Sequence, residues 1–292
     1  MKAAIYSRVM DEDQKDNVQF FFDELARQKI KPLVFDLFFE QIKNDIRFPD
    51  DAATFSLSSD LTEEVEFIIS LGGDGTLLDT VTLVQDKKIP IMGINFGRLG
   101  FLASIGKDEI KNAIKALVKR TFVVDARTMI HLDADLPLFG NVPYGLNEFA
   151  LHKQDVASMI KIHTYLNGEF LNTYWADGLI VATPTGSTGY SLSCGGPIVF
   201  PESGSFVITP VAPHNLNARP IVVPDDNVIS FEVESRSETI ICALDSRKEI
   251  VGKHVALAVK KEKFNINLLR LSENSFLQTL HDKLTWGLDK RN

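Results

Sequence analysis

Cysteine is scarce in this 292-residue sequence, which contains only Cys194 and Cys242. Neither lies in a Cys-x-x-Cys pair, and no group of histidines and cysteines has the spacing of a zinc site. A disulfide framework and a structural zinc site are therefore not expected. Two reduced thiols are typical of a cytoplasmic protein, and we expect a cytoplasmic location.

Long apolar runs and long basic runs are missing as well. The apolar stretches, such as 206–212, are far shorter than the roughly 20 residues that a membrane-spanning helix needs. The first residues turn acidic where a signal peptide would be apolar. The formal net charge is −8, and no basic run is longer than a pair such as Lys260-Lys261. We therefore expect no nucleic-acid or membrane partner, but small molecules and further copies of the chain.

Apolar residues, by contrast, are plentiful, at 45% of the chain, which is enough for one large domain or two ordinary ones. The first part of the chain alternates strand-like and helix-like patterns. Strands are predicted at 2–7, 33–35, 65–71 and 89–96, and helices around 18–26, 76–84 and 110–118. This alternation predicts an α/β domain over residues 1–120, with a parallel sheet covered on both faces.

From about residue 121 the helical spacing gives way to β-rich segments. Asn167-Gly168 between two alternating runs predicts a hairpin. Further strands are predicted at 206–210, 228–233, 239–244 and 254–259. We therefore expect a mostly β domain over 121–265. The segment 266–292, helical over 272–284, should return to the first domain, and 47–64 should be a flexible loop.

The stretch 67-FIISLGGDGTLLDT-80 places three glycines and one carboxylate between a predicted strand and a predicted helix. Ligands of open α/β sheets bind beyond the carboxyl ends of the strands, and glycines let backbone N–H groups approach a phosphate or a sugar. A carboxylate beside a phosphate would be repelled. Asp74 is therefore either a helix cap or a base or acceptor for a sugar hydroxyl.

Two familiar nucleotide-binding motifs do not match. The dinucleotide fingerprint G-x-G-x-x-G requires a glycine where this chain has Leu78. The phosphate-binding P-loop requires four residues between its glycines and a hydroxyl after its lysine, whereas 100-GFLASIGKD-108 has five and then Asp108. The sequence thus disfavours an ordinary dehydrogenase and a Walker-type ATPase.

A second polar constellation follows the predicted strand at 179–182. The segment 183-TPTGSTGYSLS-193 offers hydroxyls, backbone amides and the aromatic ring of Tyr190. Asn147 and Glu148 precede another apolar strand, although such a pair alone is more often solvent-facing. His152, His163 and His214 receive no role, because a single histidine in a strand is more often structural.

Together these motifs resemble the NAD kinase family, whose members phosphorylate the 2′-hydroxyl of the adenosine ribose of NAD. The GGDGT loop alone is shared with diacylglycerol and sphingosine kinases, but its combination with TPTGST and Asn-Glu is specific. The resemblance is carried by GGDGT at 72–76, NFGRLGFL at 95–102, Asn147-Glu148, DG at 177–178, TPTGSTGYSLS at 183–193, PHNLNARPIV at 213–222 and Asp245-Ser246.

The resemblance implies an N-terminal α/β domain and a C-terminal β domain. It also implies ATP as phosphate donor, Mg²⁺ or another divalent cation as cofactor, NAD as acceptor, and a homodimer or homotetramer. No metal site made of protein side chains is expected.

Carried over to this chain, the resemblance makes Asp74 the general base that takes the 2′-hydroxyl proton, with Gly75 at the same ribose. Asn147 is expected at the adenosine, Glu148 at the hydroxyls or the metal-bound phosphates, and Asp177 at the nicotinamide end. The segment expected to line the adenine pocket comprises Thr188, Gly189, Tyr190, Ser191, Leu192 and Ser193.

The chain departs from the family pattern at two positions. Gly189 stands where alanine is usual, a loss of one methyl group that should be tolerated, and Arg247 stands where glutamine or asparagine is frequent. Two other functions remain as alternatives. A lipid or diol kinase of the diacylglycerol kinase type would use the same glycine loop, and a dinucleotide sensor would bind without catalysis.

Overall fold

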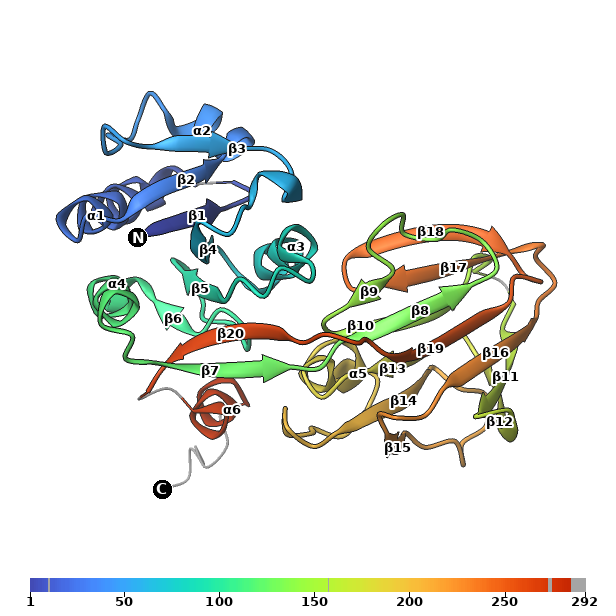
Figure 1. Ribbon diagram of the computed structural model, residues 1–292. Helices are drawn as coiled ribbons and strands as arrows, with labels where there is room; N and C mark the ends of the chain where they lie inside the picture. Colours follow the sequence, from blue (N-terminus) through green and yellow to red (C-terminus); the bar gives the residue numbers. More distant parts are fainter. Residues whose placement is uncertain (10, 157, 273–274, 285–292) are drawn as a thin grey trace, which may run out of the picture. The chain divides into compact units, whose positions relative to one another are not determined.

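The computed structural model of the protein describes residues 1–9, 11–156, 158–272 and 275–284. The chain divides into two compact units (Figure 1). One unit comprises Met1–Ala126 together with Ile266–Asn292, and the other comprises Arg127–Asn265. The first unit is therefore built from two separate pieces of sequence, while the second is continuous.

An eight-stranded sheet forms the centre of the first unit, in the order β3-β2-β1-β4-β5-β20-β7, with β6 paired to β5. The pairs β1–β2, β1–β4, β4–β5 and β5–β20 are parallel, which confirms the predicted parallel sheet. The strands are β1 (Lys2–Tyr6), β2 (Lys31–Phe35), β3 (Ala53–Phe55), β4 (Val65–Leu71), β5 (Ile91–Asn95), β6 (Ile105–Gly106), β7 (Phe122–Arg127) and β20 (Ile266–Leu271).

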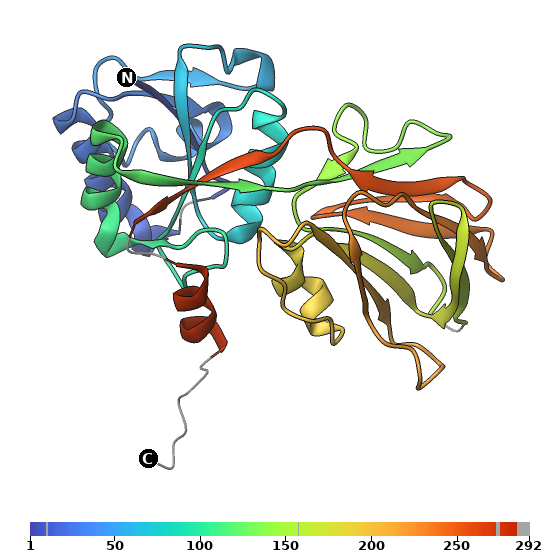
Figure 2. The ribbon, with the colours of Figure 1, turned by 60° about the horizontal axis from the view of Figure 1, so that its bottom comes forward.

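Helices cover both faces of this sheet. The α-helices are α1 (Lys15–Arg27), α2 (Asp36–Ile42), α3 (Asp74–Val84), α4 (Ile110–Lys119) and α6 (Phe276–Leu284), and the short 3-10 helices are η1 (Glu12–Gln14), η2 (Ser58–Asp60) and η3 (Lys107–Glu109). Helices α1 and α4 pack on one face, where Phe22 and Ile114 share a buried cluster with Ile94 of β5. Helix α3 lies on the other face (Figures 1 and 2). A Cβ on Gly93, the residue before Ile94, would come within 2.8 Å of Leu77 in α3.

Strand β20 is the main feature of this unit that the sequence pattern did not predict. Leu268 pairs with Ile91 and Leu269 with Met92, so the chain returns to the first sheet as a strand before it forms α6. The predicted C-terminal helix is confirmed as α6, and residues 273, 274 and 285–292 lie outside the described part.

The stretch 47–64, expected to be a loop, contains a strand. Within it, β3 pairs in parallel with β2, so that Phe55 lies beside Phe35. The side chain of Phe55 is buried and contacts the Phe35 ring edge-on, with the ring centroids 5.5 Å apart. This apolar contact attaches the segment to the edge of the sheet.

Two six-stranded antiparallel sheets form the second unit, ordered β15-β14-β13-β10-β17-β18 and β12-β11-β16-β19-β8-β9. The strands are β8 (Ile130–Ala134), β9 (Tyr144–Gly145), β10 (Glu148–Lys153), β11 (Ile160–Leu166), β12 (Glu169–Ala176), β13 (Gly178–Ala182), β14 (Ser205–Val211), β15 (Ile221–Pro224), β16 (Ile229–Glu234), β17 (Thr239–Leu244), β18 (Arg247–Gly252) and β19 (Leu257–Lys261). One apolar core, including Phe149 and Val181 from the first sheet and Ile162 and Phe231 from the second, joins the two sheets as a sandwich. The predicted β domain is confirmed.

The predicted hairpin is present as well. Strands β11 and β12 pair antiparallel around Asn167 and Gly168, whose φ angles are +50° and +84°. Both residues are in the left-handed region, which a two-residue turn between twisted strands requires. Within the described residues of both units, no helix is long and apolar enough to cross a membrane.

Candidate functional site

The glycine loop stands at the carboxyl edge of the first sheet, as the sequence predicted. Strand β4 ends at Leu71, and α3 begins at Asp74. Gly72 has φ of +147°, and a Cβ there would lie 2.5 Å from the hydroxyl oxygen of Thr76. A glycine at this position therefore lets the chain turn directly from strand to helix.

Asp74 is fixed by the backbone of a distant segment. Its Oδ2 accepts a hydrogen bond from the Phe101 N–H at 2.9 Å, and its Oδ1 accepts from Leu102 and Ala103 at 3.0 Å each. A Cβ on Gly100 would come within 1.7 Å of Oδ1, so the close approach needs glycine there. The cap position of α3 is Gly73, without a side-chain cap bond. Asp74 is thus not a helix cap, and its carboxylate has a defined orientation.

Asn95 at the end of β5 shapes the other end of the same segment. Its Oδ1 accepts from the Gly97 N–H at 2.9 Å, and its Nδ2 donates to the Arg98 carbonyl at 2.8 Å. The NFGRLGFL motif, which carried no assigned role in the sequence, therefore forms a turn that Asn95 holds at its start and Asp74 holds at its end.

In the second unit, three strand ends meet at Asn147 and Glu148. Strand β10 lies between β13 and β17 and is antiparallel to both, with Glu148 opposite Ala182 and Phe149 opposite Leu244. The start of β10 therefore lies beside the ends of β13 and β17. The Thr183 N–H donates to the Asn147 carbonyl at 2.8 Å.

Asp245, to which the sequence pattern assigned no role of its own, organises this edge. Its buried carboxylate accepts N–H bonds from Leu146 and Asn147 at 2.8 Å each and from Glu148 at 3.1 Å. Burial raises the pKa of Asp245 above its usual range, against the opposing effect of these N–H groups and of Arg247. Its φ of +53° is a left-handed conformation, which aspartate adopts more readily than most residues do.

Two side-chain oxygens at this edge are buried without a hydrogen-bond partner among the described residues. They are Oδ1 of Asn147 and Oε2 of Glu148. Burial, with a smaller contribution from Asp245, raises the pKa of Glu148 to about 8, although the Tyr190 N–H opposes the shift. Leaving a buried acceptor unpaired costs about 1–3 kcal/mol, so such atoms in a folded protein point to a bound ligand or water.

The segment 183–193 is a compact turn. It forms η4 (Gly186–Thr188) and α5 (Tyr190–Ser193). Its hydroxyls make hydrogen bonds inside the fold, so they have less capacity left for a ligand. Thr183 donates to the Leu146 carbonyl at 2.6 Å, Ser187 to the Pro184 carbonyl at 2.7 Å and Thr188 to the Thr185 carbonyl at 3.2 Å, and Ser191 bonds the Thr209 hydroxyl at 2.8 Å.

Tyr190 is within reach of the charges of Asp177 and Glu148. The pKa of Tyr190 is raised by burial and, to a lesser degree, by Cys194, Asp177 and Glu148. The Tyr190 ring remains 40% exposed, with its centroid 5.6 Å from that of His152. Of the other predicted residues, Gly189 and Leu192 are half-buried and Ser193 is exposed.

Asp177 is half-buried and forms an ion pair with Lys153, with 2.6 Å between Oδ1 and Nζ. The pair lies where β10 ends and β13 begins, because His152 pairs with Gly178. Burial lowers the pKa of His152, while Asp177 opposes that shift. His152 is therefore mainly neutral near pH 7, and it serves as a packing partner of Tyr190.

The two departures from the family pattern have structural explanations. A Cβ on Gly189 would lie 3.3 Å from Oε2 of Glu148, a close contact that a small shift relieves. Arg247 donates to the Val142 and Tyr144 carbonyls, and its guanidinium lies 5.5 Å from the centre of the Phe139 ring. Arg247 thus fixes the chain that leads into the Asn147 edge.

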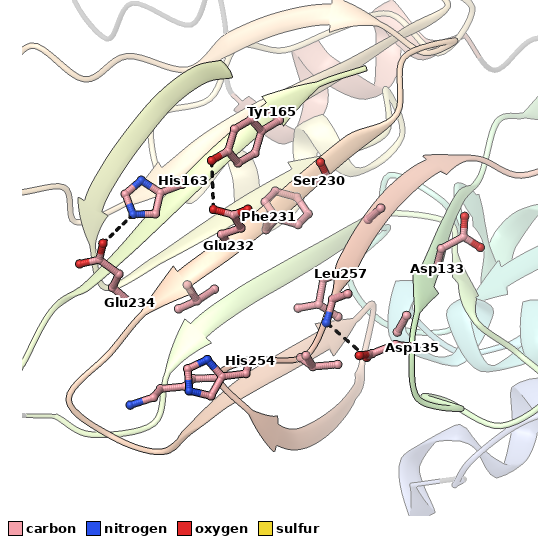
Figure 3. Close-up of a pocket in the computed structure, with 16 residues that line it drawn as sticks. Asp133, Asp135, His163, Tyr165, Ser230, Phe231, Glu232, Glu234, His254 and Leu257 are labelled. Atoms are coloured by element: carbon pink, nitrogen blue, oxygen red, sulfur yellow. Dashed lines mark hydrogen bonds and ion pairs between the residues drawn. The ribbon is translucent and has the colours of Figure 1, made fainter. Parts of the chain in front are cut away.

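A separate cavity of about 770 Å³ lies in the second unit, lined mainly by β11, β16 and the start of β19 (Figure 3). None of the predicted site residues lines it. Two pairs of its polar side chains bond each other, His163 with Glu234 and Tyr165 with Glu232, each at 3.0 Å. This cavity therefore shows none of the unpaired buried atoms that mark the Asn147 edge.

No cluster of three or more histidine, cysteine, aspartate or glutamate side chains suited to a metal ion occurs within the described ranges. Each unit thus contributes a distinct feature: an oriented carboxylate at a glycine loop in the first, and unpaired buried oxygens beside an aromatic ring in the second.

Two solved structures share this architecture over nearly the whole chain. An NAD kinase from Archaeoglobus fulgidus in complex with ATP has a TM-score of 0.77 and 26% identity, covering 98% of this chain and 99% of that one. The yeast NADH kinase complexed with NADH has a TM-score of 0.87 and 23% identity, covering 99% and 88%. The chain thus has the two-domain fold of these kinases.

The sequence comparisons are more specific. Residues 32–122 match the ATP-NAD kinase N-terminal domain and residues 146–270 match the ATP-NAD kinase C-terminal domain. The NAD kinase of Cytophaga hutchinsonii is 47% identical over 290 residues and 99% of both chains, and that of Flavobacterium psychrophilum is 42% identical over 100% of both. The chain belongs to the NAD kinase family.

Proposed function

We propose that the protein is an NAD kinase, which transfers the terminal phosphate of ATP to the 2′-hydroxyl of the adenosine ribose of NAD to give NADP. The observation that carries this proposal is the full-length similarity to NAD kinases, 47% identity over 290 residues, which includes both family domains. The oriented carboxylate of Asp74 and the unpaired oxygens of Asn147 and Glu148 supply matching chemistry.

In this proposal Asp74 takes the proton from the ribose hydroxyl as that hydroxyl attacks the terminal phosphorus. Its three N–H bonds hold the carboxylate in one orientation, which favours proton transfer from a positioned hydroxyl. Gly75 follows Asp74 in the first turn of α3 and lacks a side chain that would keep the ribose away.

Asn147 would bind the adenosine end of the nucleotide, and Glu148 the hydroxyls or the metal-bound phosphates. The Oδ1 of Asn147 is an acceptor that the fold leaves unpaired, and it suits an amino or hydroxyl donor. The segment 188–193 would pack beside the adenine, mainly through the exposed Tyr190 ring and the backbone, because the Ser191 hydroxyl is bonded to Thr209. Asp177 would contact the nicotinamide end.

We further propose a divalent cation such as Mg²⁺ as cofactor. Mg²⁺ in kinases is held by substrate phosphates and one or two carboxylates, so a protein cluster of three ligands is not required. The Oε2 of Glu148, which has no partner among the described residues, fits the part of a single carboxylate ligand, and binding of the cation would release the proton that the raised pKa holds there. Bound with ATP, the cation would neutralise the charge of the phosphates.

Assembly and location follow the family expectation of a homodimer or homotetramer in the cytoplasm. Both cysteines are free thiols, Cys194 half-buried and Cys242 buried, as expected in a reducing compartment. Sedimentation at several concentrations would distinguish monomer, dimer and tetramer.

The alternatives receive no support from the comparisons. The two relatives and the two solved structures described above are NAD or NADH kinases. A kinase needs an oriented carboxylate as a base at the ribose hydroxyl. A non-catalytic sensor does not need one.

The decisive experiment is incubation of the protein with NAD, ATP and Mg²⁺, with NADP read out by an NADP-specific dehydrogenase. Formation of NADP that depends on both ATP and NAD is the expected result. Parallel reactions with diacylglycerol as acceptor test the lipid-kinase alternative. Tight NAD binding without NADP formation would instead support the sensor.

A further inference from the structure

Arg8 stands beside the glycine loop, although the sequence analysis assigned it no role. Strand β1 is the neighbour of β4 in the parallel sheet, so residues just after its end reach the same carboxyl edge as the loop. The Nη1 atom of Arg8 lies 3.4 Å, and its Cζ 3.9 Å, from the position that a Cβ on Gly75 would occupy. A group that contacts Gly75 would therefore meet this guanidinium.

The guanidinium is held in place from α3. Arg8 Nη2 donates to Asp79 Oδ1 at 2.6 Å, and Arg8 Nε pairs with Asp79 Oδ2. The hydroxyl of Tyr6 also donates to Asp79 Oδ2, at 3.2 Å. Asp79 follows Gly75 by four residues, one turn of the helix, so the two lie on the same face. The fixed geometry presents Nη1 toward Gly75.

A stabilising ion pair is the simplest explanation of this contact, but an exposed pair contributes little, typically about 0–1 kcal/mol. The Arg8 side chain is 46% exposed, so much of its surface remains accessible beside the loop. The nearby carboxylate of Asp74 is directed at the N–H groups of residues 101–103. A planar, permanently charged guanidinium in a fixed position is well suited to a phosphate oxygen.

We propose that Arg8, oriented by Asp79, binds a phosphate group of the nucleotide that occupies the glycine loop. The inference rests on the proposed kinase function, and the phosphate belongs either to the triphosphate of ATP or to the diphosphate of NAD. In both cases the phosphate would lie close to the negative carboxylate of Asp74, which repels it. The positive charge of Arg8 offsets this repulsion.

The test replaces Arg8 with methionine, which keeps most of the aliphatic stem and removes the charge. The Michaelis constants for ATP and NAD are measured separately, and binding of inorganic triphosphate is measured by calorimetry. Loss of one charged hydrogen bond should weaken phosphate binding about 10- to 100-fold. Arg8→Lys, which keeps the charge but not the planar fork, should fall between wild type and Arg8→Met.

Lys15→Ala is the matched control, because Lys15 forms an exposed ion pair with Asp45 at 2.8 Å, on α1. It should leave both Michaelis constants and triphosphate binding unchanged. In Arg8→Met, a higher Michaelis constant for ATP alone assigns Arg8 to the phosphate donor. A higher Michaelis constant for NAD alone assigns it to the acceptor. Unchanged constants and unchanged triphosphate binding in a folded Arg8→Met protein would overturn the inference.

Failure of the kinase proposal would look different. If the wild-type protein forms no NADP, triphosphate binding can still be measured, because it does not require turnover. The titration then compares Arg8→Met and Arg8→Lys with wild type. Loss of triphosphate binding in Arg8→Met would then support the phosphate site alone, and equal binding in all three proteins would count against it.

Discussion

The polar side chains of the two candidate site regions fall into two groups, which differ in their hydrogen bonds. Asp74 and Asp245 each accept three backbone N–H bonds, whereas Asn147 and Glu148 each keep one buried oxygen without a partner among the described residues. The bonded carboxylates fix backbone segments. The unbonded oxygens are therefore the better candidates for direct ligand contacts in the second unit.

Replacement of Asp74 by asparagine should lower kcat by about two or more orders of magnitude, because the amide cannot take the hydroxyl proton. The affinity for NAD should change little. The amide keeps one oxygen for Leu102 and Ala103 but turns an NH₂ group toward the Phe101 N–H, so melting curves must accompany the kinetics. Asp86→Asn, at an exposed residue just after α3, is the control. Near-normal turnover in Asp74→Asn would exclude Asp74 as the base.

Replacement of Asn147 by alanine should weaken NAD binding by about 1–3 kcal/mol, because a ligand donor loses its buried acceptor. The stability of the free protein should change less, since Oδ1 has no partner to lose among the described residues. Calorimetric titration and thermal unfolding separate the two effects. Asn112→Ala, on the exposed face of α4, should alter neither. Equal NAD affinity in Asn147→Ala and wild type would remove Asn147 from the site.

Glu148 should make the stability depend on pH. Its pKa is raised from 4.5 to about 8, so the folded protein binds the proton more tightly than the unfolded chain does. The resulting stabilisation is complete below pH 4.5 and is lost as the pH rises through about 8. The side chain in Glu148→Gln cannot ionise, so the stability of this variant should not fall in this way as the pH rises.

Denaturant unfolding at pH 5 and pH 8.5 measures the effect. Between these values wild type should lose stability relative to Glu148→Gln on the order of 1–4 kcal/mol. Glu202→Gln, at an exposed carboxyl, should follow wild type at both pH values. Parallel stability curves for wild type and Glu148→Gln would show that the Glu148 carboxyl is not shifted.

At the scale of elements, the turn from Asn95 to Ala103 and helix α3 depend on each other. Gly100 lies where any side chain would meet Asp74, with a Cβ only 1.7 Å from Oδ1. Gly100→Ala must therefore push the Asp74 carboxylate away from Leu102 and Ala103. We expect a loss of kcat comparable to that of Asp74→Asn and a lower melting temperature.

Gly252→Ala is the matched control for that prediction, because a Cβ at Gly252 meets no atom within 4 Å. It should leave both kcat and melting temperature close to wild type. Full activity of Gly100→Ala would mean that the contact with residues 101–103 does not orient the catalytic carboxylate.

The sequence predicted elements well where one local pattern determined them. Two local signals show this. An apolar run followed by glycines predicted β4 and its turn, and Asn167-Gly168 between alternating runs predicted a hairpin, and both features are present. The internal hydrogen bonds of the Ser/Thr-rich segment were not predicted, because composition does not reveal the partners of Ser187 and Ser191. The role of Asp245 was missed because its three donors lie about a hundred residues away in sequence.

For the whole molecule, the change of pattern near residue 121 predicted two units, and residues 266–292 were expected to return to the first, but strand β20 was not predicted. Its six residues, INLLRL, are consistent with a strand of either unit. Its place beside β5 depends on a long-range pairing, in which Leu268 meets Ile91. Local periodicity carries no information on such a partner.

The discontinuous first unit leads to a prediction for separated fragments. Residues 1–126 alone lack β20, which lies between β5 and β7 and buries Ile266, Leu268 and Leu269. Each buried aliphatic side chain contributes about 1.5–3 kcal/mol, so their loss approaches the whole stability of a domain, about 5–15 kcal/mol. Fragment 1–126 should therefore not unfold cooperatively on heating.

Joining residue 126 to residue 266 through a short Gly-Ser linker should restore a cooperative unit. Strands β7 and β20 are neighbours in the sheet, and their arrows point in opposite directions, so a hairpin-sized connection of about 2–5 residues can join them (Figures 1 and 2). Fragment 127–265, which is continuous, should fold without a linker. Circular dichroism during heating measures all three proteins. If 1–126 alone melted as sharply as the joined unit, β20 would not be an essential strand of the first sheet.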